Sequence, residues 1–431
     1  MTATSSRAGG ATNAHRLIDL FPDTAAVEGG ELVVGGVRTS ALADEYGTPL
    51  VVYCGDTVLA RARAYARVDP EALVVYGTKA FPNVALLRLL AAEGLGADVS
   101  TAGELEFALR AGVPGERIVF HGNNKSDDEL RAAAAAGALV VLDALDEPAR
   151  AQAAGVATVL IRVTPGIEAE THRAIQTAHA ESKFGLVADD AVAAVRDARS
   201  AGLDVAGLHV HIGSQLTQSA ESLLAVERLA DVALRCRAEL DWAPRVFDLG
   251  GGLAVRHSLD EIVPEPEEFV RELLVRLREH WPEPARLIFE PGRSLVGSAG
   301  FTLYRVGVIK RTTGLTYAAV DGGMSDNPRP QLYGSRYEAL LANRADEPNS
   351  GTYRIAGKHC ESGDVLIDSV ELPEPRRDDL LAVPATGAYT LAMASNYNSV
   401  PRPAAVLVAD GRAELIRRRE TLDDLLNFEA K

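Results

Sequence analysis

The stretch ALVVYGTKAFPNVALLRLLAAEGLGADVS, residues 72–100, decides the fold. It holds an apolar run at 72–79, an amphipathic segment that ends in glycine, and a second apolar run at 96–100. Short apolar runs of this kind predict strands that are buried on both faces. A glycine after an amphipathic segment is a typical helix end. The stretch therefore predicts a β-α unit that leads into a second, parallel strand.

The same alternation continues along the chain. Eight apolar runs are predicted strands, at residues 72–79, 96–100, 117–122, 139–144, 158–165, 207–213, 246–252 and 287–293. Eight β-α units predict a closed (β/α)₈ barrel, which we expect to occupy residues 51–297. An open, doubly wound sheet is the alternative.

The rest of the chain predicts a second, all-β domain. After Ser298 the apolar runs, such as VLIDSVEL at 365–372, are separated by turns without regular helices. This pattern predicts a β-sandwich or β-barrel domain over residues 298–431. We expect the strand-like segment at 31–50 to join this domain, because a lone strand cannot bury itself. The first residues are small and polar, and we expect residues 1–30 to be a disordered leader.

The charge and cysteine content limit the partners and the compartment. The net charge of −16 argues against nucleic acid and against anionic membrane surfaces as partners. No apolar run approaches the roughly 18 residues that a membrane span needs. Cys54, Cys236 and Cys360 are too few and too far apart for a disulfide framework or a compact zinc motif. These features predict a cytoplasmic protein without a metal.

Unusual residues follow the predicted strands at the end where a parallel barrel carries its chemistry. Lys79 ends the first strand, His211 the sixth, the Gly250–Gly252 run the seventh, and Glu290 and Arg293 the eighth. Each has an ordinary explanation when taken singly. Lysines after strands are commonly exposed, single histidines commonly belong to the core, and glycine runs commonly form tight turns.

Taken together, these residues predict a site for pyridoxal 5'-phosphate (PLP). A buried lysine has a lowered pKa and can form a Schiff base with a carbonyl carbon. Glycine N–H groups after the seventh strand can bind a phosphate, and the His211 ring can stack on a pyridine ring. The carboxylate of Glu290 can pair with the pyridine nitrogen.

A set of motifs in a fixed order carries a family resemblance. The motifs are YGTKAFPN, GADVSTAGELEFALRAG, VFHGNNKS, RVTPGIEAETH, SKFG, GLHVHIGSQ, DLGGGL, EPGRSLVGSAG, VDGGMSDNPRPQLYG, GKHCESGD and TGAYTLAMASNYNSVPRP. The chain from about residue 40 resembles the fold-type III PLP-dependent decarboxylases, which have a barrel like that of alanine racemase, and among them the diaminopimelate decarboxylase family. Gln331 in PRPQLYG stands where that family usually has alanine.

The resemblance implies a homodimer that converts meso-2,6-diaminopimelate to L-lysine and CO₂, the last step of lysine biosynthesis. It implies that Lys79 is the Schiff-base lysine and that Cys360 returns a proton to the substrate, with Cys360 and Glu361 contributed by the partner subunit. The implied cofactor-binding residues are Lys79, His211, Ser214, Gly251, Gly252, Glu290, Gly292, Arg293 and Tyr397. The implied substrate-binding residues are Arg293, Arg329, Tyr333, Glu361 and Tyr397.

Other functions remain open at the level of sequence. A sister decarboxylase would act on another amino acid, a carboxylated polyamine or a carrier-bound aminoacyl group. A racemase would need a proton donor on each face of the substrate carbon. A protein of a different class would bind PLP without turnover. Arg329 could be an ordinary turn residue and Cys360 an inert buried thiol.

Overall fold

Eight parallel strands close into a barrel in the computed structural model, which describes residues 16–167 and 182–430. Strand β12 pairs with β5 and closes the ring, so the predicted barrel is confirmed and the doubly wound sheet is excluded. The strands are β5 (Leu73–Gly77), β6 (Gly96–Val99), β7 (Ile118–Phe120), β8 (Leu139–Leu142), β9 (Thr158–Arg162), β10 (Asp204–His209), β11 (Val246–Asp248) and β12 (Arg286–Phe289).

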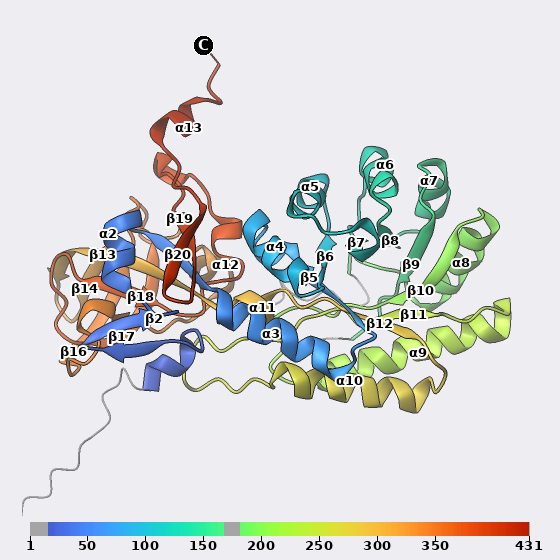
Figure 1. The fold of residues 1–431 in the computed structure, drawn as a ribbon, viewed down its shortest axis with the longest axis horizontal. Helices are drawn as coiled ribbons and strands as arrows, with labels where there is room; N and C mark the ends of the chain where they lie inside the picture. Colours follow the sequence, from blue (N-terminus) through green and yellow to red (C-terminus); the bar gives the residue numbers. More distant parts are fainter. Residues whose placement is uncertain (1–15, 168–181, 431) are drawn as a thin grey trace, which may run out of the picture.

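Helices surround the barrel (Figure 1), and glycine ends some of them, as expected from the sequence. The Ser126 hydroxyl and the Glu129 carboxylate form a capping box at the start of α6, and Gly137 ends that helix in a left-handed conformation. The helices are α3 (Gly55–Val68), α4 (Val84–Ala92), α5 (Ala102–Ala111), α6 (Asp127–Ala136), α7 (Glu147–Ala153), α8 (Ala188–Ser200), α9 (Ala220–Leu240) and α10 (Pro266–His280). In the part of the chain that the structure describes, no helix has the length and apolarity that crossing a bilayer requires.

The second domain is built on a nine-stranded sheet, as the all-β prediction requires, and lies beside the barrel (Figure 1). Its long strand β13 pairs with β4, β14 and β18, and its apolar side chains enter two hydrophobic cores. The strands are β4 (Leu50–Cys54), β13 (Gly300–Arg311), β14 (Thr316–Val320), β15 (Leu340–Leu341), β16 (Gly351–Ala356), β17 (Val365–Leu372), β18 (Leu380–Val383), β19 (Ala404–Ala409) and β20 (Arg412–Arg417).

The expectation that residues 1–30 form a disordered leader is partly wrong. Leu17, Leu20 and Phe21 are buried in the core of the β domain, where the ring of Phe21 packs edge-on against Phe301 at 5.7 Å. The segment that contains them is ordered because these three side chains remove apolar surface from water. Residues 1–15 of the expected leader lie outside the described residues.

The N-terminal strand of the β domain is a different one from that predicted. The run at 31–34 forms β2 (Glu31–Val34) in a separate three-stranded sheet with β1 (Ala26–Glu28) and β3 (Val37–Arg38). Strand β4 instead enters the large sheet between β13 and β19. All five residues of β4 are buried, as a central strand requires, so residues 51–54 belong to the β domain and not to the barrel.

A buried ion pair joins two loops at the C-terminal end of the barrel. The Lys125 amine lies 2.9 Å from the Glu147 carboxylate and donates hydrogen bonds to the carbonyls of Gly122 and Val141. The Glu147 carboxylate also accepts a hydrogen bond from the Asp143 N–H group. The pair therefore holds the loop after β7 against the loop after β8.

We predict that Lys125→Met destabilises the protein by about 3–5 kcal/mol, because it leaves the buried Glu147 carboxylate without its cation. The double variant Lys125→Met/Glu147→Gln should recover much of this loss, since no buried charge remains. Urea unfolding of the wild type and both variants provides the measurement. A single variant as stable as the wild type would show that the pair does not hold the loops.

Candidate active site

Residues from many strand ends line one cavity of about 310 Å³ at the C-terminal end of the barrel. Its size and its mixture of apolar walls with polar groups are typical of a small-molecule site. The lining residues are Lys79, Ser100, His121, Gly122, Arg162, Phe184, His209, His211, Gly213, Ser214, Gly252, Leu253, Glu290, Gly292, Arg293, Arg329, Tyr333 and Tyr389.

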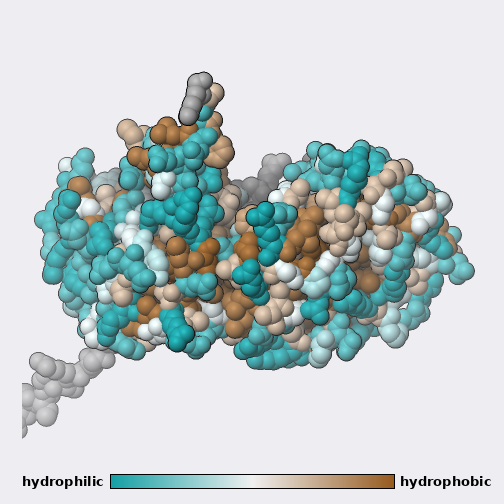
Figure 2. Space-filling model, turned by 45° about the horizontal axis from the view of Figure 1, so that its top comes forward, coloured by the Kyte–Doolittle hydropathy of each residue, from teal (hydrophilic) through white to brown (hydrophobic). Residues whose placement is uncertain are grey.

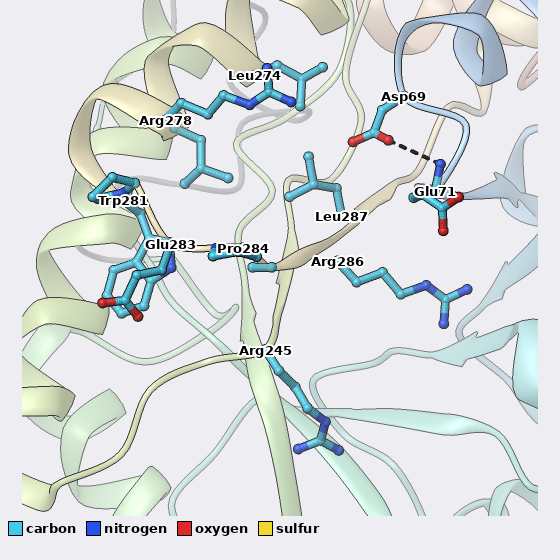
Figure 3. A pocket seen from close by; sticks show the side chains of 13 residues that line it. Asp69, Glu71, Arg245, Leu274, Arg278, Trp281, Glu283, Pro284, Arg286 and Leu287 are labelled. Atoms are coloured by element: carbon cyan, nitrogen blue, oxygen red, sulfur yellow. Dashed lines mark hydrogen bonds between the residues drawn. The ribbon is translucent and has the colours of Figure 1, made fainter.

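A larger cavity of about 960 Å³ lies at the opposite end of the barrel (Figure 3). It is lined in part by Arg245 and Arg286, which stand at the N-terminal ends of β11 and β12. Their guanidinium groups point in different directions, and Arg245 is paired with Asp204 (Figure 3). Because these polar groups do not converge, the smaller cavity is the better candidate for chemistry.

The amine of Lys79 lies in the cavity and is held by Asp98. Lys79 belongs to a short 3₁₀ turn after β5, and its Nζ atom donates to the Asp98 carboxylate at 2.6 Å. The side chain of Lys79 is 44% exposed, whereas Asp98 is buried. Burial alone would lower the pKa of Lys79, but Asp98, Tyr389 and Glu290 together raise it above its usual value. The expected lowering is therefore wrong for this arrangement, because a neighbouring anion outweighs burial.

The carboxylate of Glu290 is surrounded by imidazoles. The Nε2 atom of His121 lies 2.5 Å from Glu290 Oε1, and the Nε2 atom of His209 lies 3.5 Å from Glu290 Oε2. Burial alone would raise the pKa of Glu290, but the two imidazoles hold it well below its usual range. Burial also lowers the pKa of His209 to about 4 and that of His211 well below its usual value. The cavity thus keeps Glu290 ionised and favours the neutral forms of the His209 and His211 rings.

A second carboxyl group, Asp248, lies next to Glu290 at the end of β11. It is fully buried, and its Oδ1 atom accepts a hydrogen bond from the Gly250 N–H group. Burial and the charge of Glu290 raise the pKa of Asp248 well above its usual value. Ligand atoms of His121, His209, Asp248 and Glu290 lie within 4.8 Å of one another, a spacing that could also hold a metal ion. The absence of a metal remains a prediction.

Gly251 and Gly252, which follow β11, have no side chains that cover their backbone at the edge of the cavity. A Cβ atom on Gly251 would lie 2.2 Å from the Glu290 carbonyl oxygen, and one on Gly252 would lie 2.7 Å from the Gly213 carbonyl oxygen. Gly252 also has a φ of +115°, which side chains disfavour. A side chain is therefore excluded at both positions, and a phosphate could approach the bare backbone at this edge of the cavity.

Arg293 is a buried cation that uses only part of its hydrogen-bonding capacity. Its Nε and one terminal nitrogen donate to the Ser214 hydroxyl at 3.2 and 3.0 Å, and its guanidinium lies 4.6 Å from the centre of the Tyr389 ring. The other terminal nitrogen is buried and has no hydrogen-bond partner among the described residues. Burial and the nearby charge of Arg329 lower the pKa of Arg293 to about 10. These features fit a group that binds an anion.

The β domain supplies the far wall of the cavity. The short helix α12 (Arg329–Tyr333) carries two of the predicted substrate residues. The Arg329 guanidinium donates to the Tyr337 and Ser335 hydroxyls and lies 5.6 Å from the centre of the Tyr333 ring. The structure thus brings the predicted residues Arg293, Arg329 and Tyr333 to one cavity with Lys79.

Three other predicted residues form a separate cluster on the surface, which we call the thiol cluster: Cys360, Glu361 and Tyr397. The Tyr397 hydroxyl donates to the Glu361 carboxylate at 3.3 Å, and the Cys360 N–H donates to the Asn398 side chain at 3.2 Å. Cys360 is an exposed, free thiol, so it is not an inert buried one. None of these three described residues lines the cavity of their own chain.

The cavity contains residues that sequence reasoning missed. Tyr389 was not predicted, and its ring lies against the guanidinium of Arg293. Tyr389 and the predicted Tyr397 both occur in TGAYTLAMASNYN, and the motif alone does not show which one faces the barrel. Asp98 and His121 could have been found as polar residues in or just after predicted buried strands. These two residues were quoted only as parts of longer motifs and were not assigned roles. The same is true of Arg162 and Asp248.

The loop that carries Cys360 and Glu361 is tied to α12. The Gln331 amide donates to the carbonyl oxygens of Gly363 and Val365, both at 2.9 Å. The His359 ring lies 2.8 Å from the Ser325 hydroxyl, and Asp364 accepts a hydrogen bond from the His359 N–H group. Gln331 therefore faces the loop rather than the substrate residues beside it in the sequence.

Comparisons with known proteins agree on one family. The family model described as "Pyridoxal-dependent decarboxylase, pyridoxal binding domain" matches residues 55–297. The chain is 43% identical over 432 residues to a diaminopimelate decarboxylase of Halalkalibacterium halodurans, covering 95% of this chain and 98% of the relative. It is 45% identical over 422 residues to a diaminopimelate decarboxylase of Actinosynnema pretiosum, covering 95% of each chain.

Solved structures show the same likeness. The crystal structure of diaminopimelate decarboxylase from M. jannaschii superposes with a TM-score of 0.90 and 32% identity, over 95% of this chain and 98% of that one. A lysine/ornithine decarboxylase from Vibrio vulnificus has a TM-score of 0.75 and 24% identity, over 86% of this chain and 97% of that one, and shares the fold.

We predict that Gln331→Ala loosens the loop Gly357–Asp364, because it removes two hydrogen bonds worth about 1 kcal/mol each. The measurement is amide hydrogen exchange, which should be roughly 30-fold faster in this loop than in the wild type, since each 1.4 kcal/mol is a factor of ten. Gln152→Ala on the surface of α7 is the matched control and should leave the loop unchanged. Wild-type exchange in Gln331→Ala would show that the amide does not hold the loop.

Proposed function

The chain belongs to the pyridoxal-dependent decarboxylases, and among them to the diaminopimelate decarboxylases, and on that premise we propose which residues carry out the reaction. The protein is a PLP-dependent carboxy-lyase that converts meso-2,6-diaminopimelate to L-lysine and CO₂. The observation that carries the residue assignments is one cavity in which an amine, a bare glycine backbone, an ionised carboxylate and a buried guanidinium meet.

The residues of the cavity fit PLP. Lys79 would hold it through its amine. Gly251 and Gly252, with Ser214, Gly292 and the unpartnered nitrogen of Arg293, would hold its phosphate. When bound, PLP supplies an electron sink that stabilises the charge left on the substrate carbon after CO₂ departs.

Two residues would hold the ring of the cofactor. Glu290 keeps its negative charge because His121 and His209 stabilise it, so it can pair with a protonated ring nitrogen. His211 is kept neutral by burial, and its Nδ1 atom accepts a hydrogen bond from the Gly251 N–H group, which fixes the ring for stacking.

The far wall of the cavity accounts for the choice of substrate. Diaminopimelate has an ammonium and a carboxylate at its distal end, and Arg329 with Tyr333 would bind that carboxylate. Arg293 would serve either the phosphate or a substrate carboxylate. L-lysine and L-ornithine lack the distal carboxylate and would leave a buried guanidinium unpaired, which a polar site of this kind rejects strongly.

The thiol cluster supplies the remaining chemistry. Loss of CO₂ leaves an electron pair on the substrate carbon, and a proton must replace the departed carboxylate. Cys360 Sγ would donate that proton, since a thiol has a pKa suited to proton transfer near neutral pH. Glu361 would bind the distal ammonium, and Tyr397, which donates to Glu361, would hold it in place.

Because the thiol cluster lies outside the cavity of its own chain, a homodimer would complete the site, with each subunit lending the cluster to its partner. A projecting segment beside the cluster supports such a surface. Helix α13 (Leu422–Leu426) leaves Leu422, Leu426 and the following Phe428 exposed at the top of the molecule (Figures 1 and 2). Glu420, at its base, accepts a hydrogen bond from Asn396, the neighbour of Tyr397.

Three free cysteines among the described residues support a reducing, cytoplasmic compartment. The net charge of −16 supports a small-molecule substrate rather than a nucleic acid or an anionic membrane as the partner.

Incubation of the wild type with PLP and meso-diaminopimelate should release equal amounts of lysine and CO₂. Lys79→Ala should release neither, because the amine that holds the cofactor is missing. L-lysine, L-ornithine and carboxylated polyamines form the comparison panel. Faster turnover of one of these would make the protein a sister decarboxylase, and PLP binding without CO₂ release would make it a binding protein.

A mixing experiment tests the shared site. Cys360→Ala should lower kcat by roughly 10²–10⁴-fold, the range for loss of a general acid. Lys79→Ala and Cys360→Ala subunits, exchanged at equal concentration, should recover about a quarter of wild-type activity, since half the dimers are mixed and each mixed dimer has one intact site. No recovery after proven subunit exchange would show that the thiol does not act across the interface.

A further inference from the structure

Asp364 ends the motif GKHCESGD and does not line the cavity of its own chain. Its side chain is buried, and only 3% of the residue is exposed. Its Oδ2 atom accepts a hydrogen bond from the His359 N–H group at 2.8 Å, and its Oδ1 atom accepts one from the Met324 N–H group at 2.7 Å. One carboxylate therefore holds the residue before Cys360 and also the segment that leads to Arg329.

Two glycines leave room for this carboxylate. A Cβ atom on Gly357 would lie 2.1 Å from Asp364 Oδ2, and one on Gly323 would lie 2.6 Å from each carboxylate oxygen. The bare backbone at both positions lets the two chain segments approach Asp364 closely. The Gly357 N–H group also donates to the Asp364 carbonyl at 2.9 Å. The carboxylate thus lies at the base of the loop 357–364.

The backbone around Cys360 is held at three points. Asn398 accepts a hydrogen bond from the Cys360 N–H group at 3.2 Å. Asp364 accepts one from the preceding residue, and its own N–H group donates to the carbonyl of the following residue, Glu361, at 3.0 Å. Two of the three points involve Asp364, so the direction in which the thiol projects depends on this residue.

We propose that Asp364 is a positioning residue for the proton donor: it fixes the backbone around Cys360 and so places the thiol in the cavity of the partner subunit. The inference rests on the proposed function, in which Cys360 donates a proton across the dimer interface. It deepens that function, because it assigns the placement of the thiol to one buried carboxylate. The competing role would use the Met324 contact, through which Asp364 would act on Arg329 of its own chain.

An asparagine at this position keeps the shape of the side chain but not its two acceptors. A carboxylate offers two acceptor oxygens, whereas an amide offers one oxygen and one NH₂ group. In Asp364→Asn the NH₂ group would face one of the two backbone N–H groups, so one hydrogen bond is lost and two donors meet. The loop should then shift, while the barrel residues that hold PLP keep their places.

We expect Asp364→Asn to bind PLP like the wild type, as measured by visible absorbance. Its kcat for meso-diaminopimelate should fall roughly 10- to 100-fold, because a small misplacement of a reacting group has an effect of this size. Asp364→Ser is a smaller, uncharged replacement and serves as a second variant should the asparagine variant not fold. Wild-type kcat in these variants would overturn the inference.

Asp379→Asn is the matched control. This carboxylate is also buried in the β domain, but it pairs with Arg344 and accepts a hydrogen bond from the Arg376 N–H group instead of holding the loop 357–364. Asp379→Asn should therefore keep wild-type kcat. An equal fall of kcat in Asp379→Asn and Asp364→Asn would show general loosening of the domain and would contradict the proposed placement of the thiol.

A double-mutant cycle tests whether Asp364 acts through the thiol. If it does, Asp364→Asn/Cys360→Ala should have the kcat of Cys360→Ala alone, since no thiol is left to misplace. If the double variant instead loses the full effect of both single changes, Asp364 has a role that does not involve Cys360, and the inference is wrong.

Subunit mixing shows which site Asp364 serves. Wild-type and Lys79→Ala subunits, exchanged at equal concentration, should have about half the activity of the same amount of wild-type protein, because each mixed dimer has one intact site. If the Lys79→Ala chain also carries Asp364→Asn, its loop serves the only usable amine of the mixed dimer, and the activity should fall to about a quarter. Activity that stays at a half would show that Asp364 does not act across the interface.

These measurements also separate the inference from the proposed function. If Cys360→Ala lowers kcat but Asp364→Asn keeps the wild-type kcat, the inference alone is wrong. If Cys360→Ala itself keeps the wild-type kcat, the thiol is not the proton donor, and the role of Asp364 falls with it.

Discussion

The pairing of the first barrel strand with the last is the contact on which the site depends. Ile288 and Phe289 of β12 lie beside Leu73 and Val74 of β5, and the Gly77 N–H group then bonds to the Pro291 carbonyl. This closure brings the segment that holds Lys79 against the segment that holds Glu290. In an open sheet these two ends would lie at opposite edges, and an amine and a carboxylate from them could not share one cavity.

The closed ring also explains why the electrostatics of the site form one connected system. Lys79 pairs with Asp98, His121 reaches both Asp98 and Glu290, and Asp248 lies next to Glu290. Each group comes from a different strand end, so only the barrel as a whole sets their distances. Burial raises the pKa of Asp248 and the Glu290 charge adds to that rise, whereas for Lys79 the neighbouring anions raise the pKa against the effect of burial.

Sequence patterns predicted most of this arrangement, and their failures have physical causes. Periodicity located all eight barrel strands, because strands buried on both faces are continuously apolar. Lys79, His211, Glu290 and Arg293 were found because chemistry gathers at strand ends. Tyr389 was missed, because the direction of a side chain in an irregular segment depends on tertiary contacts. The burial of Leu17 and the pairing of β4 also depend on residues far away in the chain.

The position of β4 has a consequence for the order in which the chain folds. Its partners begin at Gly300 and Ala404, so every barrel strand is synthesised between β4 and the strands that flank it. As the chain leaves the ribosome, the barrel can close while β4 still has both edges exposed. Five apolar residues with unpaired backbone groups are a surface that chaperones bind and that aggregates readily. Completion of the C-terminal domain therefore does more than supply Arg329 and Cys360, because it also covers both edges of β4.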